Sequence, residues 1–110
     1  MKARFPYLTK KEMEAMSMLV EPSAAHWYKK ELSLADGDCL RIFVRLGGCE
    51  SAQPGYSLGI MKDLPVNPGV KLVVEGIVFF IEENNLWYLD NKDLRIRFDE
   101  HQDDILMEVV

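Results

Sequence analysis

The run VKLVVEGIVFFIEE, residues 70–83, restricts the fold of this chain more than any other segment. Two segments rich in β-branched and aromatic residues meet at Glu75 and Gly76, where glycine can take the positive φ of a tight hairpin turn. Successive side chains of a strand point to opposite faces, so Phe79 lies on one face and Phe80 on the other. Because a strand that is apolar on both faces must be covered on both, the sequence predicts a hairpin within two packed layers.

The other expected elements follow from apolar periodicity and from turn residues. Residues 63–69 contain two prolines and a glycine, which predict irregular structure. Pro22 suits the first turn of a helix, whose apolar face holds Ala24, Trp27, Tyr28 and Leu32. The remaining elements, in chain order, are that helix over 22–34, strands over 39–46 and 56–62, a short helical or turn segment over 84–91, a last strand over 93–99 and an acidic end over 100–110.

Length and charge limit the class of protein. With 110 residues and 48% hydrophobic content the chain can bury one core, and we expect one domain over 17–110 preceded by an extension over 1–16. A net charge of -5 without a basic cluster argues against nucleic-acid binding. The sequence shows neither a membrane span nor a signal peptide, so we expect no membrane association and a cytoplasmic protein whose two cysteines are reduced.

Cys49 is the strongest candidate for chemistry. It follows Gly47 and Gly48 at the end of a strand, and a glycine turn can aim backbone N–H groups at an anion or a thiolate. The alternative interpretation is that the glycines only end the strand and that Cys49 is a small apolar filler. Cys39 stands at a strand start, and we expect it to be a packing residue.

Other side chains offer weaker sites. His101 lies within FDEHQDD, beside carboxylates that could join it in binding a cation, although acidic ends of this kind are usually solvated. Trp27 and Trp87 each belong to an aromatic pair typical of core or interface anchors. The sequence contains no phosphate-binding glycine loop, no Gly-x-Ser-x-Gly and no paired-carboxylate motif, so we expect no enzyme activity.

Four segments together resemble a known family: PSAAHWYKKEL, LRIFVRLGGC, YSLGI and VEGIVFFIEENNLWYLDNKDLRIRF. In this order they are similar to the HesB/IscA type of iron-sulfur biogenesis domain. The resemblance covers residues 18–99 and places Cys49 on the family's first cluster-ligand cysteine. It implies a mainly β, α+β fold, namely a flattened pseudo-barrel of two mixed sheets with one main helix packed against it. It also implies that Cys49 binds iron or an iron-sulfur cluster.

The chain departs from that family at its tail. Members that carry clusters end in a Cys-x-Cys pair, whereas residues 100–110 contain no cysteine, so the chain is most similar to the short, single-cysteine branch called YneR-like. One thiolate per chain cannot complete a four-thiolate cluster site. The first hypothesis is therefore a protein of iron-sulfur cluster biogenesis that binds iron or a cluster weakly through Cys49, helped by a second chain or by His101.

The alternative hypothesis is a cluster-free module that keeps the carrier fold and binds a partner protein through its aromatic surface. The missing Cys-x-Cys pair motivates this interpretation. A protein partner or a homo-oligomer is expected under both hypotheses.

Overall fold

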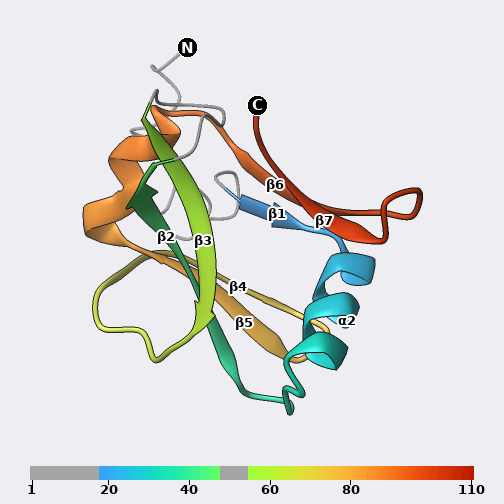
Figure 1. Ribbon diagram of the computed structural model, residues 1–110. Coiled ribbons are helices and arrows are strands. Elements are labelled where there is room, and N and C mark those ends of the chain that lie inside the picture. Colours follow the sequence, from blue (N-terminus) through green and yellow to red (C-terminus); the bar gives the residue numbers. More distant parts are fainter. Residues whose placement is uncertain (1–17, 48–54) are drawn as a thin grey trace, which may run out of the picture.

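The computed structural model describes residues 18–47 and 55–110 (Figure 1). In these residues the mainly β, α+β class is confirmed. The elements are β1 Met18–Val20, α2 Pro22–Glu31, β2 Cys39–Leu46, β3 Tyr56–Lys62, β4 Pro68–Val74, β5 Ile77–Glu82, the 3-10 helix η2 Glu83–Leu89, β6 Leu94–Asp99 and β7 Asp104–Val109. Neither helix in this part of the chain is long and apolar enough to cross a membrane.

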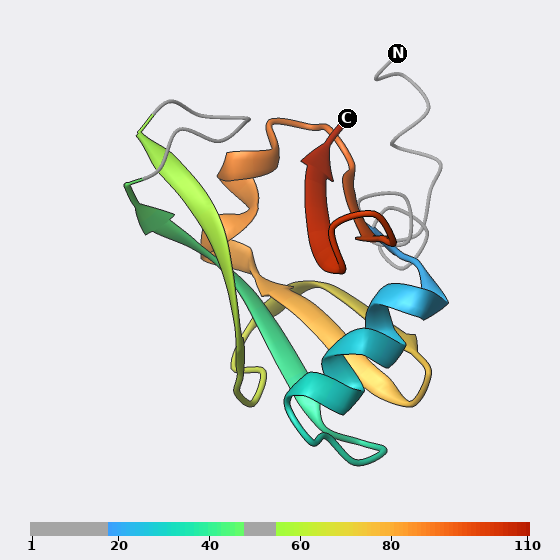
Figure 2. The same ribbon diagram turned by 45° about the vertical axis from the view of Figure 1, so that its right-hand side comes forward.

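The strands form two mixed sheets. In the four-stranded sheet the order is β3-β2-β5-β4, with β2 parallel to β5 and the other neighbours antiparallel. In the three-stranded sheet the order is β1-β6-β7, with β1 parallel to β6 and β7 antiparallel to it. Buried side chains of both sheets and of α2 belong to one apolar cluster. The two packed layers that the sequence predicts are therefore present, and Figure 2 shows how the two sheets are arranged.

The helix α2 closes one side of this core. Pro22 is its first residue, as predicted. The ring of Tyr28 lies edge-on to that of Phe79, with ring centroids 6.3 Å apart, which joins the helix to the centre of the larger sheet. The buried side chains of the helix are Ala24, Ala25 and Tyr28. Trp27 is half-buried and stands edge-on to Tyr28 at the margin of the core.

The helix is three residues shorter than predicted. It ends at Glu31, because Ser33 takes a left-handed φ of 52° and turns the chain. Leu32 is consequently exposed instead of lying on the buried face, and Leu34 enters the core from the turn that follows. The prediction had continued the apolar periodicity through residues that belong to this turn.

The predicted hairpin forms β4 and β5. Glu75 has a φ of 53° and Gly76 a φ of 79°, and two positive values in a two-residue loop are the type I′ geometry that suits twisted antiparallel strands. Val74 pairs with Ile77 directly across this turn. The hairpin and its turn position are therefore confirmed.

We expect Gly76→Ala to destabilise the protein by about 1–2 kcal/mol, because alanine is strained at positive φ. A Cβ at this position would also come 2.5 Å from Asp36 Oδ1. Gly37→Ala is the matched control, since Gly37 has a φ of 94° and open space around its Cα. Urea unfolding of both variants should show a larger loss for Gly76→Ala, and equal losses would mean that Asp36 simply moves aside.

The prediction of irregular structure through residue 69 was wrong in part. Residues 63–67 are irregular, but β4 begins at Pro68. Proline is tolerated as the first residue of an edge strand, where its missing N–H costs no ladder bond. The next residue is a glycine, Gly69, because a Cβ at this position would collide with Leu86 of η2. The strand register shifts between Pro68 and Val70.

The sequence pattern missed two strands. β1 has three residues, which is too short for a period of two to be visible. β7 occupies residues 104–109, where the prediction was an acidic end, so β6 is not the last strand. Five of the six residues of β7 are half-buried, which produces no clear alternation of apolar and polar residues.

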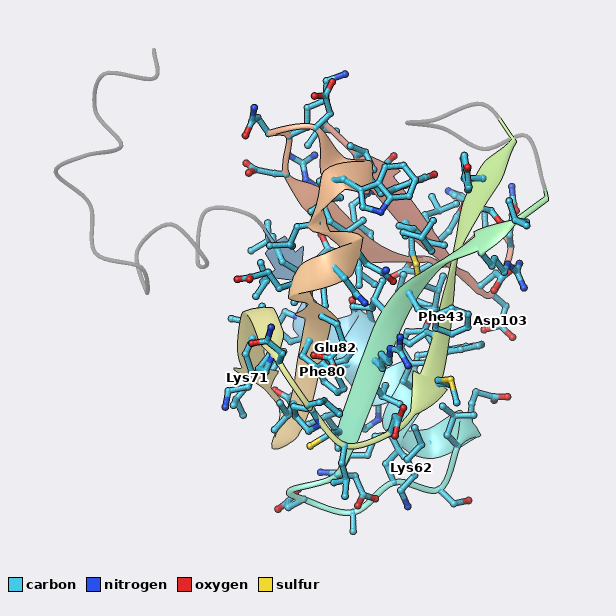
Figure 3. The ribbon with its side chains drawn as sticks, turned by 90° about the vertical axis from the view of Figure 1, so that its left-hand side faces the viewer. Phe43, Lys62, Lys71, Phe80, Glu82 and Asp103 are labelled. Carbon is cyan, nitrogen blue, oxygen red and sulfur yellow. The ribbon has the colours of Figure 1, made fainter. Side chains whose placement is uncertain are left out.

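The connection between β3 and β4, residues 63–67, passes over part of the second face of the larger sheet. It has to cross β2 and β5, which lie between the strands that it joins. The carboxylate of Glu82 accepts hydrogen bonds from the backbone N–H groups of Val66 and Asn67, at 2.9 and 2.8 Å. Phe80 points to the same side, which we call the outer face, and is fully buried there (Figure 3).

Candidate functional site

Cys49, the main predicted site residue, lies outside the described residues. The structure describes the two strands that lead to it: Leu46 pairs with Tyr56, and the N–H of Gly47 donates to the carbonyl of Gly55 at 2.8 Å. Residues 48–54 therefore connect the two strands of a hairpin. The role assigned to Cys49 stays a prediction.

The structure describes Arg45, which precedes the glycine turn, and Cys39, the other cysteine. Arg45 lies four residues before Cys49, and its Nε donates to Ser57 Oγ at 3.1 Å across the β2–β3 pair. Cys39 is a free, half-buried thiol whose sulfur lies 3.7 Å from the carbonyl oxygen of Gly37. This placement fits the packing role that the sequence predicts for Cys39.

An exposed apolar surface lies at the end of the larger sheet, where β2 and β3 lead to residues 48–54. Trp87 is 50% exposed, and its ring meets that of Tyr56 edge-on, with centroids 5.2 Å apart. Leu46, the strand partner of Tyr56, is 81% exposed. We call these three residues the Trp87 surface. A solvent-facing Trp beside an exposed aliphatic side chain is typical of a protein-binding anchor.

The helix η2 holds the Trp87 surface in place. The strand β5 pairs with β2 only as far as Ile42. Farther along β2, the side-chain oxygen of Asn85 in η2 accepts a hydrogen bond from the backbone N–H of Val44 at 2.9 Å. Trp87 also stands edge-on to Tyr88, which is fully buried, with centroids 6.0 Å apart. Trp87 therefore rests on the core and is fixed relative to β2.

The helix α2 lies beside the β6–β7 hairpin (Figures 1 and 2). A groove between them is the second candidate surface. Its larger part has a volume of about 540 Å³ and includes Trp27 and Phe98 among its lining residues. An adjoining part of about 400 Å³ shares Ser23, Phe98 and Glu100 with it. We call the two parts the Trp27 groove. The structure thus places the two predicted aromatic anchors, Trp27 and Trp87, on different surfaces.

The Trp27 groove brings together side chains that are distant in sequence. His26 lines the larger part and His101 the adjoining part. The remaining lining residues are Glu21, Pro22, Lys30, Glu75, Arg97, Asp99, Asp103 and Leu106. The groove was not predicted from the sequence, because the turn over residues 100–103 belongs to the β6–β7 hairpin, which was not predicted either. The apolar residues of the segment ILMEV, after the acidic run, were a weak signal for that hairpin.

His101 lies exposed on the β6–β7 turn, and its backbone N–H donates to Asp99 Oδ1 at 2.9 Å. Across residues 18–47 and 55–110, no three side chains of His, Cys, Asp or Glu are grouped so that they could hold a metal ion. The described part of the chain therefore gives the metal-binding prediction no support.

Tyr28 is next to Trp27 in the helix and therefore lies near the Trp27 groove. Burial, together with the negative charge of Asp104, raises its pKa to about 12. Its phenol is therefore protonated at neutral pH and acts as an apolar core ring there.

Comparison with known proteins gives two informative relatives. The chain is 48% identical over 93 residues to a Bacillus subtilis protein named pyruvate dehydrogenase inhibitor, a match that covers 84% of this chain and 98% of the relative. It is 32% identical over 93 residues to an uncharacterized protein of Staphylococcus saprophyticus, covering 82% and 95%. No family model and no solved structure matches the chain.

These relatives correct the first functional hypothesis. The prediction of a protein of iron-sulfur cluster assembly that binds metal is wrong, because a relative at 48% identity that matches over almost its whole length is named as an inhibitor of pyruvate dehydrogenase. The resemblance rested on the order of strands and on one cysteine turn, and the family's Cys-x-Cys pair was already missing from it. The chain belongs to the same protein family as the Bacillus subtilis pyruvate dehydrogenase inhibitor.

Proposed function

We propose that this chain is a protein inhibitor of pyruvate dehydrogenase that acts by binding to it. The observation that carries the proposal is the 48% identity to the Bacillus subtilis inhibitor, spread over 98% of that protein. The proposal agrees with the alternative hypothesis drawn from the sequence, a cluster-free module that binds a partner protein.

The Trp87 surface supports a function by binding. Trp87 is a large aromatic side chain that is half exposed yet fixed by contacts with Tyr56 and Tyr88. An anchor that is already ordered loses little conformational entropy when a partner covers it. Aromatic residues of this kind contribute a large share of the binding free energy in many protein interfaces.

The direct test is an activity titration. Bacillus subtilis pyruvate dehydrogenase is the enzyme to use, because the relative comes from that organism. Adding the purified chain should lower the rate of the enzyme in a saturable way, and co-sedimentation should show the two proteins in one complex. A rate unchanged at a large excess of the chain would refute the proposal.

We expect Trp87→Ala to raise the chain concentration needed for half inhibition by about tenfold or more, because loss of a hot-spot aromatic costs at least about 1.4 kcal/mol of binding free energy. Val66→Ala is the control, since Val66 is 89% exposed but lies on the β3–β4 connection. Both variants should keep their far-UV circular dichroism spectra. If Val66→Ala weakens inhibition and Trp87→Ala does not, the contact surface lies on the outer face instead.

The HesB/IscA architecture is a further part of the proposal, limited to the fold. Two mixed sheets that share one core with the main helix are compatible with a flattened pseudo-barrel. An experimental structure of the chain, superposed on a HesB/IscA domain, tests whether the strand order is the same.

A further inference from the structure

The Trp27 groove has aromatic walls and more negative than positive charge. Glu75, Glu100 and Asp103 line its larger part and are exposed. No ion pair within the described residues involves these three carboxylates. Among the residues that line this part, Lys30 carries the one full positive charge, and His26 is the other basic group.

The adjoining part of the groove adds two basic residues, His101 and Arg97. Arg97 is bound to Glu108 by two hydrogen bonds, from Nε at 3.0 Å and from Nη2 at 3.2 Å, so its charge is compensated. Glu21, Asp99 and Glu100 are the carboxylates of this part. The whole groove therefore offers a negative potential to whatever enters it.

We propose that the Trp27 groove is the docking site for a lysine or arginine side chain presented by the partner protein. The aliphatic stem of that side chain would lie against Trp27 and Phe98, and its cationic head would stand among Glu75, Glu100 and Asp103. Aromatic faces and carboxylates both attract such a head group, and the long apolar stem suits an aromatic wall. A volume of about 540 Å³ is in the range of sites that hold a ligand of a few residues.

The identity of the partner rests on the proposed function, whereas the preference for a cationic side chain does not. Two separate measurements therefore test the two statements. The first uses a small probe and needs no pyruvate dehydrogenase. The second uses the enzyme.

The first measurement is an NMR titration of the full chain with the blocked peptide acetyl-Gly-Arg-Gly-amide. The matched probe is the same peptide with citrulline in place of arginine, which has nearly the same shape without the charge. We expect the arginine peptide to shift the Trp27 indole and Phe98 ring signals, and to bind about fivefold more tightly than the citrulline peptide. Equal binding of the two peptides, or shifts confined to other residues, would overturn the proposal.

The variant for both measurements is the double substitution Glu100→Gln with Asp103→Asn, which removes two charges from the groove. Its control is Glu83→Gln with Asp93→Asn, which removes the same charge from exposed positions outside the groove. The groove variant should bind the arginine peptide about fivefold more weakly, and the control should stay within about twofold of the unmodified chain. A control that loses as much affinity would show that only the net charge matters, which would also overturn the proposal.

In the second measurement, inhibition of pyruvate dehydrogenase by each double variant is measured at several salt concentrations. We expect the groove variant to need several-fold more protein for half inhibition and to show a weaker dependence on salt. Peptide binding together with unchanged inhibition would overturn the docking role. If the unmodified chain does not inhibit the enzyme, the proposed function is refuted. The peptide titration would still show whether the Trp27 groove binds a cationic side chain.

A second copy of this chain is the competing occupant, and sedimentation velocity distinguishes it. If the unmodified chain is dimeric and the groove variant is monomeric, the groove is a self-association surface and the proposal is overturned. If the sedimentation coefficients of both proteins are the same, this competing explanation is removed and the docking role is supported.

Discussion

Phe80→Ala is expected to destabilise the protein by about 3–5 kcal/mol, the range for truncating a fully buried phenylalanine. The side chain is fully buried although it lies on the outer face of the larger sheet, outside the main apolar core. Its removal would leave a cavity on the outer face of the sheet. Urea unfolding followed by tryptophan fluorescence would measure the loss as a lower midpoint.

Val73→Ala is the matched control for Phe80→Ala. Val73 pairs with Val78 on the neighbouring strand, so its side chain shares the outer face, but it is 63% exposed. Truncating it should change the free energy of unfolding by less than about 0.5–1 kcal/mol. If Phe80→Ala and Val73→Ala lower the free energy of unfolding by the same amount, the outer face is not packed as the structure shows.

Glu82→Ala is expected to cost about 2–3 kcal/mol. The substitution removes the acceptor of two backbone hydrogen bonds, from Val66 and Asn67, and bonds to a charged acceptor are among the stronger ones in proteins. Glu82 is only 7% exposed, so water cannot replace the carboxylate easily. Thermal and urea unfolding would measure the loss of stability.

Two further variants test the cause of this effect. Glu82→Gln keeps one acceptor oxygen and should lose roughly half as much stability. Glu83→Ala removes a neighbouring carboxylate that is exposed, and should cost far less. Hydrogen exchange gives an independent readout, because the amides of Val66 and Asn67 should exchange faster in Glu82→Ala. Unchanged exchange at these two amides would contradict the assigned role of Glu82.

Much of the fold could be predicted from local patterns. The alternation over residues 39–46 predicted β2 with its observed bounds, and residues 56–62 were predicted as the strand that forms β3. The Glu75-Gly76 turn predicted the hairpin of β4 and β5. The misses are elements whose stability comes from distant partners. β1 pairs with one side of β6, and β7 pairs with the other side. Neither β1 nor β7 has a strong sequence pattern of its own.

Less of the candidate site could be predicted. The aromatic residues Trp27 and Trp87 were recognised as anchors, but which residues surround each one depends on the tertiary structure. The Trp27 groove needs Phe98 from β6 and Asp103 from the β6–β7 turn beside α2, and that contact follows only from the packing of the smaller sheet. The function was misjudged because one cysteine on a glycine turn carried the interpretation, whereas the relative is named for an effect on another protein.

The parallel pair of β1 and β6 has a consequence for synthesis on the ribosome. Met18 pairs with Leu94, so the first described strand acquires its neighbour only when nearly all of the chain has been translated. Until then β1 has no neighbouring strand, and long-range pairing of this kind is slow to form. A chain truncated before β6 would leave the smaller sheet without its central strand, so cells that terminate translation early would produce a fragment prone to aggregation.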